Sequence, residues 1–180
     1  FDSSGAVLVE QERSITSVPT DSILLDDMQL QDLPPIHLWT LNEPHLYQLN
    51  LQLWQNGSLI DEQTERFGFR EAHFDKDGNF YLNGEPLKLR GLNRHQTYPY
   101  IGAAAPARLQ RKDAEIVKYE LGCNIVRTSH YPQSKHFLRR CDEIGLLVFE
   151  EIPGWQHIGD RDWQGIALRD IETKILRDRN

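Results

Sequence analysis

The sequence is poor in long apolar runs, in cysteine and in basic side chains. Its longest apolar stretches, such as residues 144–149, fall far short of the about 20 residues that a helix needs to cross a bilayer, and no charged-then-apolar leader opens the chain. Acidic residues number 27 against 20 basic ones, which gives a net charge of -7. Nucleic-acid backbones require clustered Lys and Arg. We therefore expect a soluble protein whose partner is a small neutral or polar molecule, neither a membrane nor a nucleic acid.

The two cysteines, Cys123 and Cys141, do not stand at the spacing of a metal site. We expect buried thiols, with a disulfide as the alternative. At 180 residues and 39% hydrophobic content the chain can bury a core, either as one domain or as two small ones.

The first part of the chain has the pattern of β-structure. Leu49, Leu51 and Leu53 alternate with polar or amphipathic residues, which is typical of a half-buried strand. Asn56-Gly57 then predicts a hairpin turn, with the return strand over residues 60–69. Two shorter segments, residues 6–18 and 23–30, have the mixture of apolar and polar residues that is typical of further strands. We expect residues 1–71 to be an antiparallel β-sandwich domain, truncated at its N-terminus.

The second part of the chain changes from small strands to an alternation of strands and helices. The turn signals Asp77-Gly78 and Asn83-Gly84 divide residues 72–88 into small strands. Strands are then predicted over residues 87–92, 125–129 and 146–149. Helices are predicted over residues 106–121, from Ser134 to Gly145, and from near Arg169 onward. This order requires a parallel sheet, and periodicity leaves open whether the sheet is doubly wound or belongs to a (β/α)8 barrel of about 250 residues.

Polar and aromatic residues follow each strand of the predicted parallel sheet. In both architectures ligands bind at the carboxyl ends of the strands. Hydrogen-bonding groups beside aromatic rings suit a sugar, whose hydroxyls need polar partners and whose C–H faces pack on rings. The residues in question are Asn93-Arg94-His95, Arg127-Thr128-Ser129-His130-Tyr131, Glu150-Glu151, Trp155 and His157.

These residues also have less specific interpretations. A histidine at a strand end is often only a hydrogen-bonded structural residue. His95, His130 and His157 could by number hold a metal, but the first strand lacks a His-x-His pattern. The adjacent Glu150 and Glu151 point to opposite faces of a strand, so they are not the carboxylate pair of a retaining glycosidase. We expect one of them at the inner rim, beside an Arg such as Arg127 or Arg90, and the other toward the helices.

Three segments of the chain carry a family resemblance. Residues 124–149 read NIVRTSHYPQSKHFLRRCDEIGLLVF and resemble the signature of glycoside hydrolase family 2. Residues 80–95, FYLNGEPLKLRGLNRH, are similar to the entry of that family into its barrel. Residues 39–47 and 67–70 resemble its immunoglobulin-like domain.

The resemblance implies an internal fragment of a multidomain enzyme of the β-galactosidase type. An immunoglobulin-like β-sandwich over residues 1–71 would precede the first βα units of an incomplete (β/α)8 TIM barrel over residues 72–180. The enzyme would hydrolyse terminal β-D-galactosides with retention of configuration. The resemblance makes His95 and His130 binders of sugar hydroxyls, supported by Asn93 and Arg127. It places the acid/base and nucleophile glutamates after Asn180, so we expect the isolated chain to be inactive.

The resemblance also bears on cofactor, assembly and compartment. In the family, a Glu two residues before a His helps to hold magnesium; here His157 is kept but Trp155 stands at the Glu position. We therefore expect no metal site in this chain, with magnesium left open for the parent protein, and Trp155 as a wall of the sugar site. For the parent protein the expectation is a homo-oligomer in the bacterial cytoplasm or periplasm.

Alternative functions stay open at this point. Family 2 barrels also act on β-glucuronides and β-mannosides, and the cations that would bind a glucuronide carboxylate could come from other strands. A further alternative is a noncatalytic carbohydrate-binding or interaction module built on the first 71 residues, or a purely structural piece.

Overall fold

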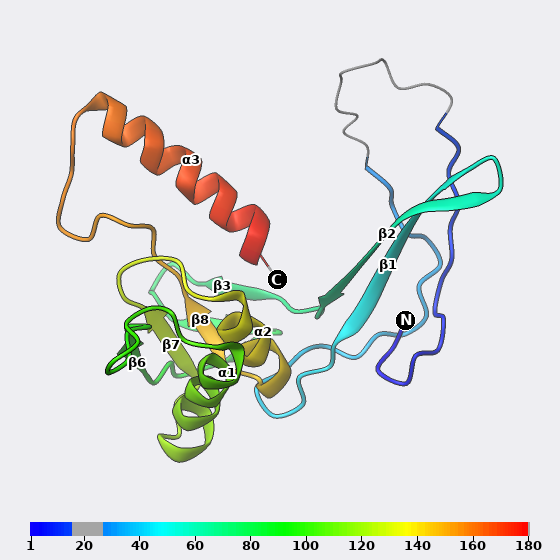
Figure 1. Cartoon of the computed structure of the whole chain (residues 1–180). Coiled ribbons are helices and arrows are strands. Elements are labelled where there is room, and N and C mark those ends of the chain that lie inside the picture. Colours follow the sequence, from blue (N-terminus) through cyan, green and yellow to red (C-terminus); the bar gives the residue numbers. More distant parts are fainter. Residues whose placement is uncertain (16–26, 180) are drawn as a thin grey trace. The chain divides into compact units, whose positions relative to one another are not determined.

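The computed structural model describes residues 1–15 and 27–179 (Figure 1). It consists of two compact units. Residues 1–37 and 47–66 form the first unit, and residues 38–46 together with the chain from Phe67 onward form the second. The predicted boundary at residues 71/72 stays a prediction.

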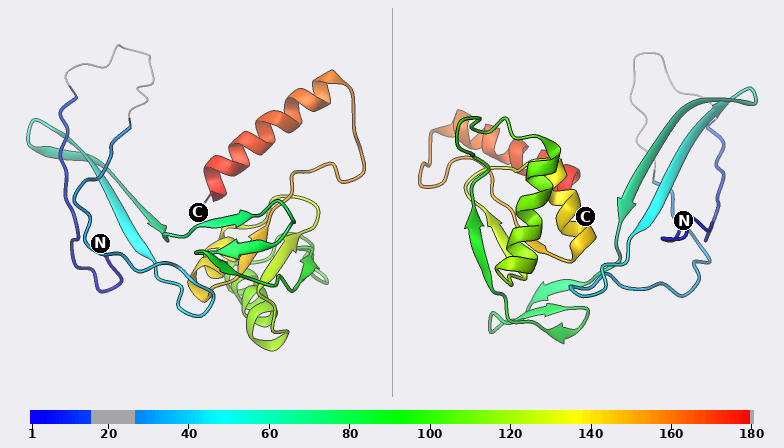
Figure 2. Two further views of the ribbon diagram at one scale, coloured as in Figure 1. Left: turned by 180° about the vertical axis from the view of Figure 1, so that it is seen from behind. Right: turned by 60° about the horizontal axis from the view of Figure 1, so that its bottom comes forward.

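The first unit contains one long hairpin, which Figure 2 shows from two sides. Its strands are β1 (Tyr47–Gln55) and β2 (Ser58–Phe67). Asn56 and Gly57 have φ of 51° and 78°, as a two-residue hairpin turn with positive φ at both positions requires. The predicted hairpin is confirmed. Its leucines at 49, 51 and 53 are exposed, so none of the residues described for this unit covers the face that the alternation predicted to be half-buried.

The two upstream segments give a different result. Residues 6–15 and 27–30 contain no strand, and the rest of the two segments lies outside the described residues. Apolar-polar alternation shows that a segment suits a sheet surface but does not supply the neighbouring strand that must pair with it. The start of the chain is instead tied to β1, since the Phe1 ammonium donates to Gln48 O at 2.9 Å and Gln48 N donates to Phe1 O at 3.0 Å.

The second unit begins with a small antiparallel sheet, in the order β3 (Ala72–Phe74), β4 (Phe80–Leu82) and β5 (Glu85–Pro86). The backbone has positive φ at Gly78 and at the Asn83-Gly84 pair. Both predicted turns and the small strands between them are therefore confirmed.

A parallel sheet follows in the order β6-β7-β8, with strands β6 (Gly91–Arg94), β7 (Ile125–Thr128) and β8 (Leu147–Phe149). Helix α1 (Ala107–Glu115), extended by the π-helical turn η1 (Ile116–Glu120), joins the first two strands, and helix α2 (Lys135–Ile144) joins the second and third. The predicted alternation is confirmed. Among the described residues this sheet has three parallel strands and does not close into a barrel, so the unit is a mixed α/β structure.

The first parallel strand lies later than predicted. Residues 87–90 precede β6, because residues 85–86 already pair with β4 and the chain must turn before it joins the new sheet. At Gly91 a Cβ would stand 2.1 Å from Ile125 O. Only glycine permits this approach of β6 to β7, which explains why the strand begins there.

Helix α2 was predicted accurately from its ends and its apolar face. The Ser134 hydroxyl accepts from His136 N at 3.3 Å, and Gly145 ends the helix with φ of 73°. Phe137, Cys141 and Ile144 are buried, as the spacing predicted. They join one core with residues of α1, η1 and β7, so α1 and α2 lie side by side on the same face of the sheet (Figure 1). The remaining core members are Ala114, Val117, Cys123, Val126 and Leu146.

Both cysteines are free and buried in this core, as predicted. Burial raises the pKa of the Cys141 thiol well above its ordinary value. Since the thiolate is the reactive form, this thiol is inert.

The last helix, α3 (Arg161–Asp178), begins well before the predicted start near Arg169. Asp160 is its N-cap and accepts from Trp163 N at 3.0 Å. The earlier start was missed because α3 carries no buried residue that would give its first turns an apolar period. In the described part of the chain, neither α3 nor any other helix combines the length and the apolar character of a membrane span.

Candidate functional site

The three parallel strands end at one edge of the sheet. Asn93 of β6 lies opposite Arg127 of β7, and Arg127 lies opposite Phe149 of β8. The segments that follow these three residues therefore leave the sheet as neighbours. This confirms the geometric premise on which the predicted site depends.

Three rings meet at this edge. The imidazoles of His95 and His130 have centroids 5.4 Å apart in an edge-on arrangement. The Trp155 indole is stacked on His130 at 5.0 Å, with an interplanar angle of 21°. Trp155 is 67% exposed, so much of its indole is available to a ligand. Tyr131 adds a fourth ring, 6.1 Å from His95.

A carboxylate joins two of the predicted residues. Glu151 Oε2 lies 2.8 Å from His130 Nδ1, and the Arg127 guanidinium donates to Glu151 Oε1. The backbone N–H of Glu151 donates to the Thr128 hydroxyl at 3.1 Å. Burial acts to raise the pKa of Glu151, but hydrogen bonds from His130 and Arg127 outweigh it and hold the pKa below its ordinary value. Glu151 is thus an ionised carboxylate between two strand ends.

Glu150 belongs to the opposite side. Burial, followed by the negative charge of Asp178, raises the pKa of Glu150 to about 7. Its backbone carbonyl accepts from Lys174 Nζ at 3.2 Å, so its partners are on α3. The expectation that the two adjacent glutamates point to opposite sides, one toward Arg127 and one toward a helix, is confirmed.

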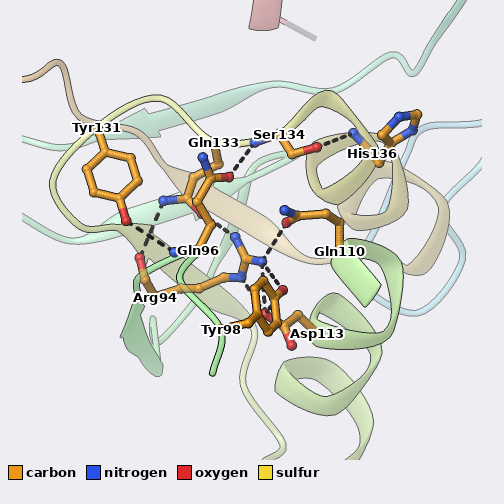
Figure 3. Close-up of polar contacts among 9 residues, drawn as sticks. All are labelled: Arg94, Gln96, Tyr98, Gln110, Asp113, Tyr131, Gln133, Ser134 and His136. Carbon is orange, nitrogen blue, oxygen red and sulfur yellow. Dashed lines mark hydrogen bonds and ion pairs between the residues drawn. The ribbon is translucent and has the colours of Figure 1, made fainter. Parts of the chain in front are cut away.

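A buried polar network that the sequence did not reveal surrounds Arg94, the residue before His95 (Figure 3). Its centre is the guanidinium of Arg94, which is 6% exposed and stands 4.0 Å over the Phe137 ring. Its hydrogen-bond and ion-pair partners are Tyr98 at 2.8 Å, Gln110 at 2.7 Å, Asp113 at 3.0 Å and Gln133. Burial, together with the hydrogen bond to Asp113, raises the pKa of Tyr98 to about 12, so Tyr98 remains a donor to that carboxylate.

The same network holds the backbone on both sides of the two site histidines. Ser129 N donates to Arg94 O at 3.0 Å, and Gln96 N donates to the Tyr131 hydroxyl at 3.2 Å. The Gln96 side chain in turn accepts from Ser134 N at 2.9 Å. The peptide bond between Ser129 and His130 is cis. The neighbours of His95 in the sequence, Arg94 and Gln96, thus bind the neighbours of His130. These bonds hold the two histidine-bearing loops together.

One signal could have identified this network in advance. Arg94 lies between Asn93 and His95, and the alternation of a strand places Arg94 on the helix-covered face while Asn93 lies on the other. A charged residue directed into a helix-covered face needs buried partners. The polar composition of the strand end alone does not single out Arg94 from its neighbours.

The structure brings most of the predicted site residues together. His95, His130, Trp155 and Arg127 form one group, and Asn93 stands opposite Arg127 in the sheet. Whether they bind a sugar stays a prediction. Glu151 is an additional member of the group, since it is the one of the two adjacent glutamates that lies beside Arg127.

His157 is not part of this group. Its ring lies edge-on against Trp163, with centroids 5.6 Å apart. Throughout residues 1–15 and 27–179, no three His, Cys, Asp or Glu side chains are arranged to hold a metal ion. The expectation that this chain has no metal site stays a prediction.

Two family models match the chain. The model described as glycosyl hydrolases family 2, TIM barrel domain, matches residues 75–176, and the one described as glycosyl hydrolases family 2 matches residues 2–70. Among curated relatives, a β-galactosidase of Thermoanaerobacter pseudethanolicus is 55% identical over 92% of this chain and 22% of its own length. A β-galactosidase of Thermoanaerobacterium thermosulfurigenes is 58% identical over 84% of this chain and 21% of its own length. The chain thus spans about a fifth of the length of these relatives.

The chain is also similar to solved structures, among them β-glucuronidases. β-Glucuronidase 3 of Bacteroides uniformis is 40% identical, with a TM-score of 0.71 over 80% of this chain and 18% of that one. A β-glucuronidase from Ruminococcus gnavus, solved in complex with D-glucuronic acid, is 27% identical, with a TM-score of 0.75 over 82% of this chain and 26% of that one. In both cases this chain covers only a small part of a much longer one.

Proposed function

Because the chain belongs to glycosyl hydrolases family 2, we propose that it is the part of a retaining β-galactosidase that contributes sugar-binding residues to the active site. In this proposal residues 1–71 belong to an immunoglobulin-like β-sandwich and residues 72–180 begin a (β/α)8 barrel. The family matches to residues 2–70 and 75–176 support the division, and the parallel order β6-β7-β8 with both helices on one face supports the barrel.

The observation that carries the proposal is the group of four rings at the carboxyl ends of the strands, called the ring cluster below. Its members are His95, His130, Tyr131 and Trp155. Two imidazoles 5.4 Å apart offer hydrogen-bonding nitrogens, and the exposed indole of Trp155 offers an apolar surface beside them. A pyranose presents both kinds of surface, hydroxyls at its edge and C–H groups on its faces. His95, His130, Asn93, Arg127 and Trp155 are thus the proposed substrate-binding residues.

The proposed chemistry needs two carboxylates that lie outside residues 1–180. One protonates the glycosidic oxygen, and the other attacks the anomeric carbon to form a glycosyl-enzyme that water then hydrolyses. Hydrogen bonds to the sugar hydroxyls that strengthen in the transition state lower the barrier. In this scheme the present chain supplies such bonds, and Glu151 binds Arg127 and His130 and does not serve as the nucleophile.

Two sugars compete as the substrate. A β-galactoside is favoured because the relatives at 55% and 58% identity are β-galactosidases. A β-glucuronide is the second candidate, because a putative β-glucuronidase of Formosa agariphila is 41% identical over 77% of this chain and solved β-glucuronidases share its fold.

Titration of the chain with galactose and with glucuronate, followed by NMR of the histidine rings, tests the proposal. We expect galactose to shift the His95 and His130 signals and glucuronate to do so only at higher concentration. The variants His95→Ala and His130→Ala should each lose galactose binding. His136→Ala is the matched control, since His136 is exposed on α2. Shifts that need less glucuronate than galactose would favour the second candidate, and shifts confined to residues 1–71 would contradict the site altogether.

A further inference from the structure

Glu151 contacts His130 of the ring cluster and also Arg127, although the proposed mechanism gives this carboxylate no catalytic role. Its carboxylate receives the Arg127 guanidinium on one oxygen and faces His130 Nδ1 at 2.8 Å on the other. The side chain is 18% exposed, and its backbone N–H is held by the Thr128 hydroxyl. Residues on β7 and just after it therefore fix the position and the rotation of this carboxylate.

The contact with His130 determines which ring nitrogen carries a proton. An ionised carboxylate only accepts hydrogen bonds, so the nitrogen that faces it must be protonated. The low pKa of Glu151 agrees with an ionised group at neutral pH. A neutral His130 must then be the Nδ1–H tautomer, which leaves Nε2 as an acceptor; in the imidazolium, Nε2 becomes a donor.

The orientation of the ring is fixed as well. Trp155 is stacked on one face of the imidazole and His95 meets it edge-on. A ring held by a carboxylate at Nδ1 and by an indole on its face has little freedom to flip. Its one unoccupied nitrogen is presented in a single direction.

We propose that Glu151 is a positioning residue that holds His130 in the Nδ1–H form, so that Nε2 is the atom that meets a substrate hydroxyl. The role toward a sugar rests on the proposed function, whereas the role toward the ring does not. Preorganisation of this kind improves binding because the ordering of the imidazole precedes the arrival of the ligand.

The first experiment determines the tautomer in the 180-residue chain. Long-range proton–nitrogen NMR spectra of the histidine-labelled chain, recorded at about pH 8 where an ordinary imidazole is neutral, distinguish Nδ1–H from Nε2–H rings. His130→Ala identifies the signal. We expect a single Nδ1–H species for His130. An Nε2–H ring, or an exchanging mixture, in the unmodified chain would overturn the proposal without any variant.

The second experiment removes the acceptor. Glu151→Met keeps the length of the side chain but cannot accept from Nδ1–H, so we expect His130 to become a mixture of tautomers. The affinity for galactose should fall about tenfold, as loss of one charge-assisted hydrogen bond predicts. Glu150→Met is the matched control, because the neighbouring carboxylate belongs to the α3 side; it should leave both the tautomer and the affinity unchanged.

The tautomer of His130 and the affinity for galactose test the positioning role and the proposed function independently. If Glu151→Met changes the tautomer but the chain does not bind galactose, the proposed function fails and the positioning role stands. If galactose binds and Glu151→Met leaves tautomer and affinity unchanged, the positioning role is wrong and the proposed function stands. If Glu151→Met does not fold, the tautomer of the unmodified chain decides.

Discussion

Arg94 holds a positive charge in a nearly closed space between β6, α1 and α2. Desolvation of a charge is costly unless hydrogen bonds and an opposite charge compensate for it. Here the compensation is nearly complete. Side chains from α1, from the loop after β6 and from the loop after β7 accept hydrogen bonds from the guanidinium, and the Phe137 ring lies beneath it. The consequence is that several elements depend on one residue for their polar partners.

Replacement of Arg94 by Met should therefore destabilise the second unit strongly. The change keeps much of the volume but leaves Asp113, Gln110 and Gln133 without their shared donor, which costs about 3 kcal/mol for a broken buried ion pair. Urea unfolding should show a lower midpoint with an unchanged slope. Arg139→Met, at an exposed position of α2, is the control. Equal midpoints for the two variants would show that the Arg94 network adds nothing to stability.

At the same scale, sequence patterns brought out the proposed site residues better than the residues that support them. His95 and His130 could be found because they follow strands at the edge where ligands bind. The opposite orientation of Glu150 and Glu151 followed from strand alternation alone. Three of the four polar partners of Arg94 could not be found, because Gln110, Asp113 and Gln133 are 16 to 39 residues away in the sequence and no local period connects them to Arg94.

At the scale of elements, helix α3 is held by polar contacts more than by a core. None of its residues is buried as a whole, and Ile166, Leu168 and Ile175 are exposed. Its last turns instead reach the rest of the unit through Lys174, which donates to Glu150 O at 3.2 Å, and Arg177, which donates to Gln133 O at 3.2 Å. The carboxyl group of Glu150 lies beside Asp178 in the same region.

This arrangement predicts that α3 is held less firmly at alkaline pH. The pKa of Glu150 is raised from 4.5 to about 7 by burial and by the charge of Asp178, so the fold favours the protonated form. A raised pKa contributes stability that is fully present below the unfolded value and is lost as the pH rises through about 7. Hydrogen exchange of the α3 amides should therefore accelerate, beyond its intrinsic pH dependence, between roughly pH 6 and pH 8.

Glu150→Gln removes the titration while it keeps the shape of the side chain. In that variant the extra acceleration should be absent, whereas Glu172→Gln, at an exposed position of the same helix, should retain it. An unchanged pH profile in Glu150→Gln would mean that another group controls the docking of α3.

The elements themselves could be predicted where local chemistry marks both ends. Helix α2 has a Ser134 cap, a Gly145 stop and a regular apolar face, and the β1–β2 hairpin has Asn56-Gly57. Where the ends depend on tertiary contacts, the prediction was wrong. The start of β6 is set by the approach of Gly91 to Ile125, and α3 lacks an apolar period in its first turns.

At the scale of the whole molecule, the fold class followed from the order of elements, but closure of the sheet did not. Alternating strands and helices required a parallel sheet, and the three parallel strands bear this out. The sequence could not choose between a doubly wound sheet and a barrel, because both use the same βα unit. The helices α1 and α2 share one core on one face of the sheet, which is the arrangement of a barrel wall.

The isolated chain should bind galactose without hydrolysing galactosides. A retaining mechanism needs two carboxyl groups about 5 to 5.5 Å apart across the glycosidic bond. Glu151 is engaged by Arg127 and His130, and Glu150 belongs to the α3 side, so this adjacent pair cannot supply them. Incubation of the chain with a chromogenic β-galactoside should give no release of the chromophore above the buffer rate, while the galactose titration shows binding. His130→Ala separates true turnover from a contaminating enzyme: hydrolysis that disappears in this variant would prove that the chain itself carries a catalytic carboxylate pair, and hydrolysis that persists unchanged would identify a contaminant.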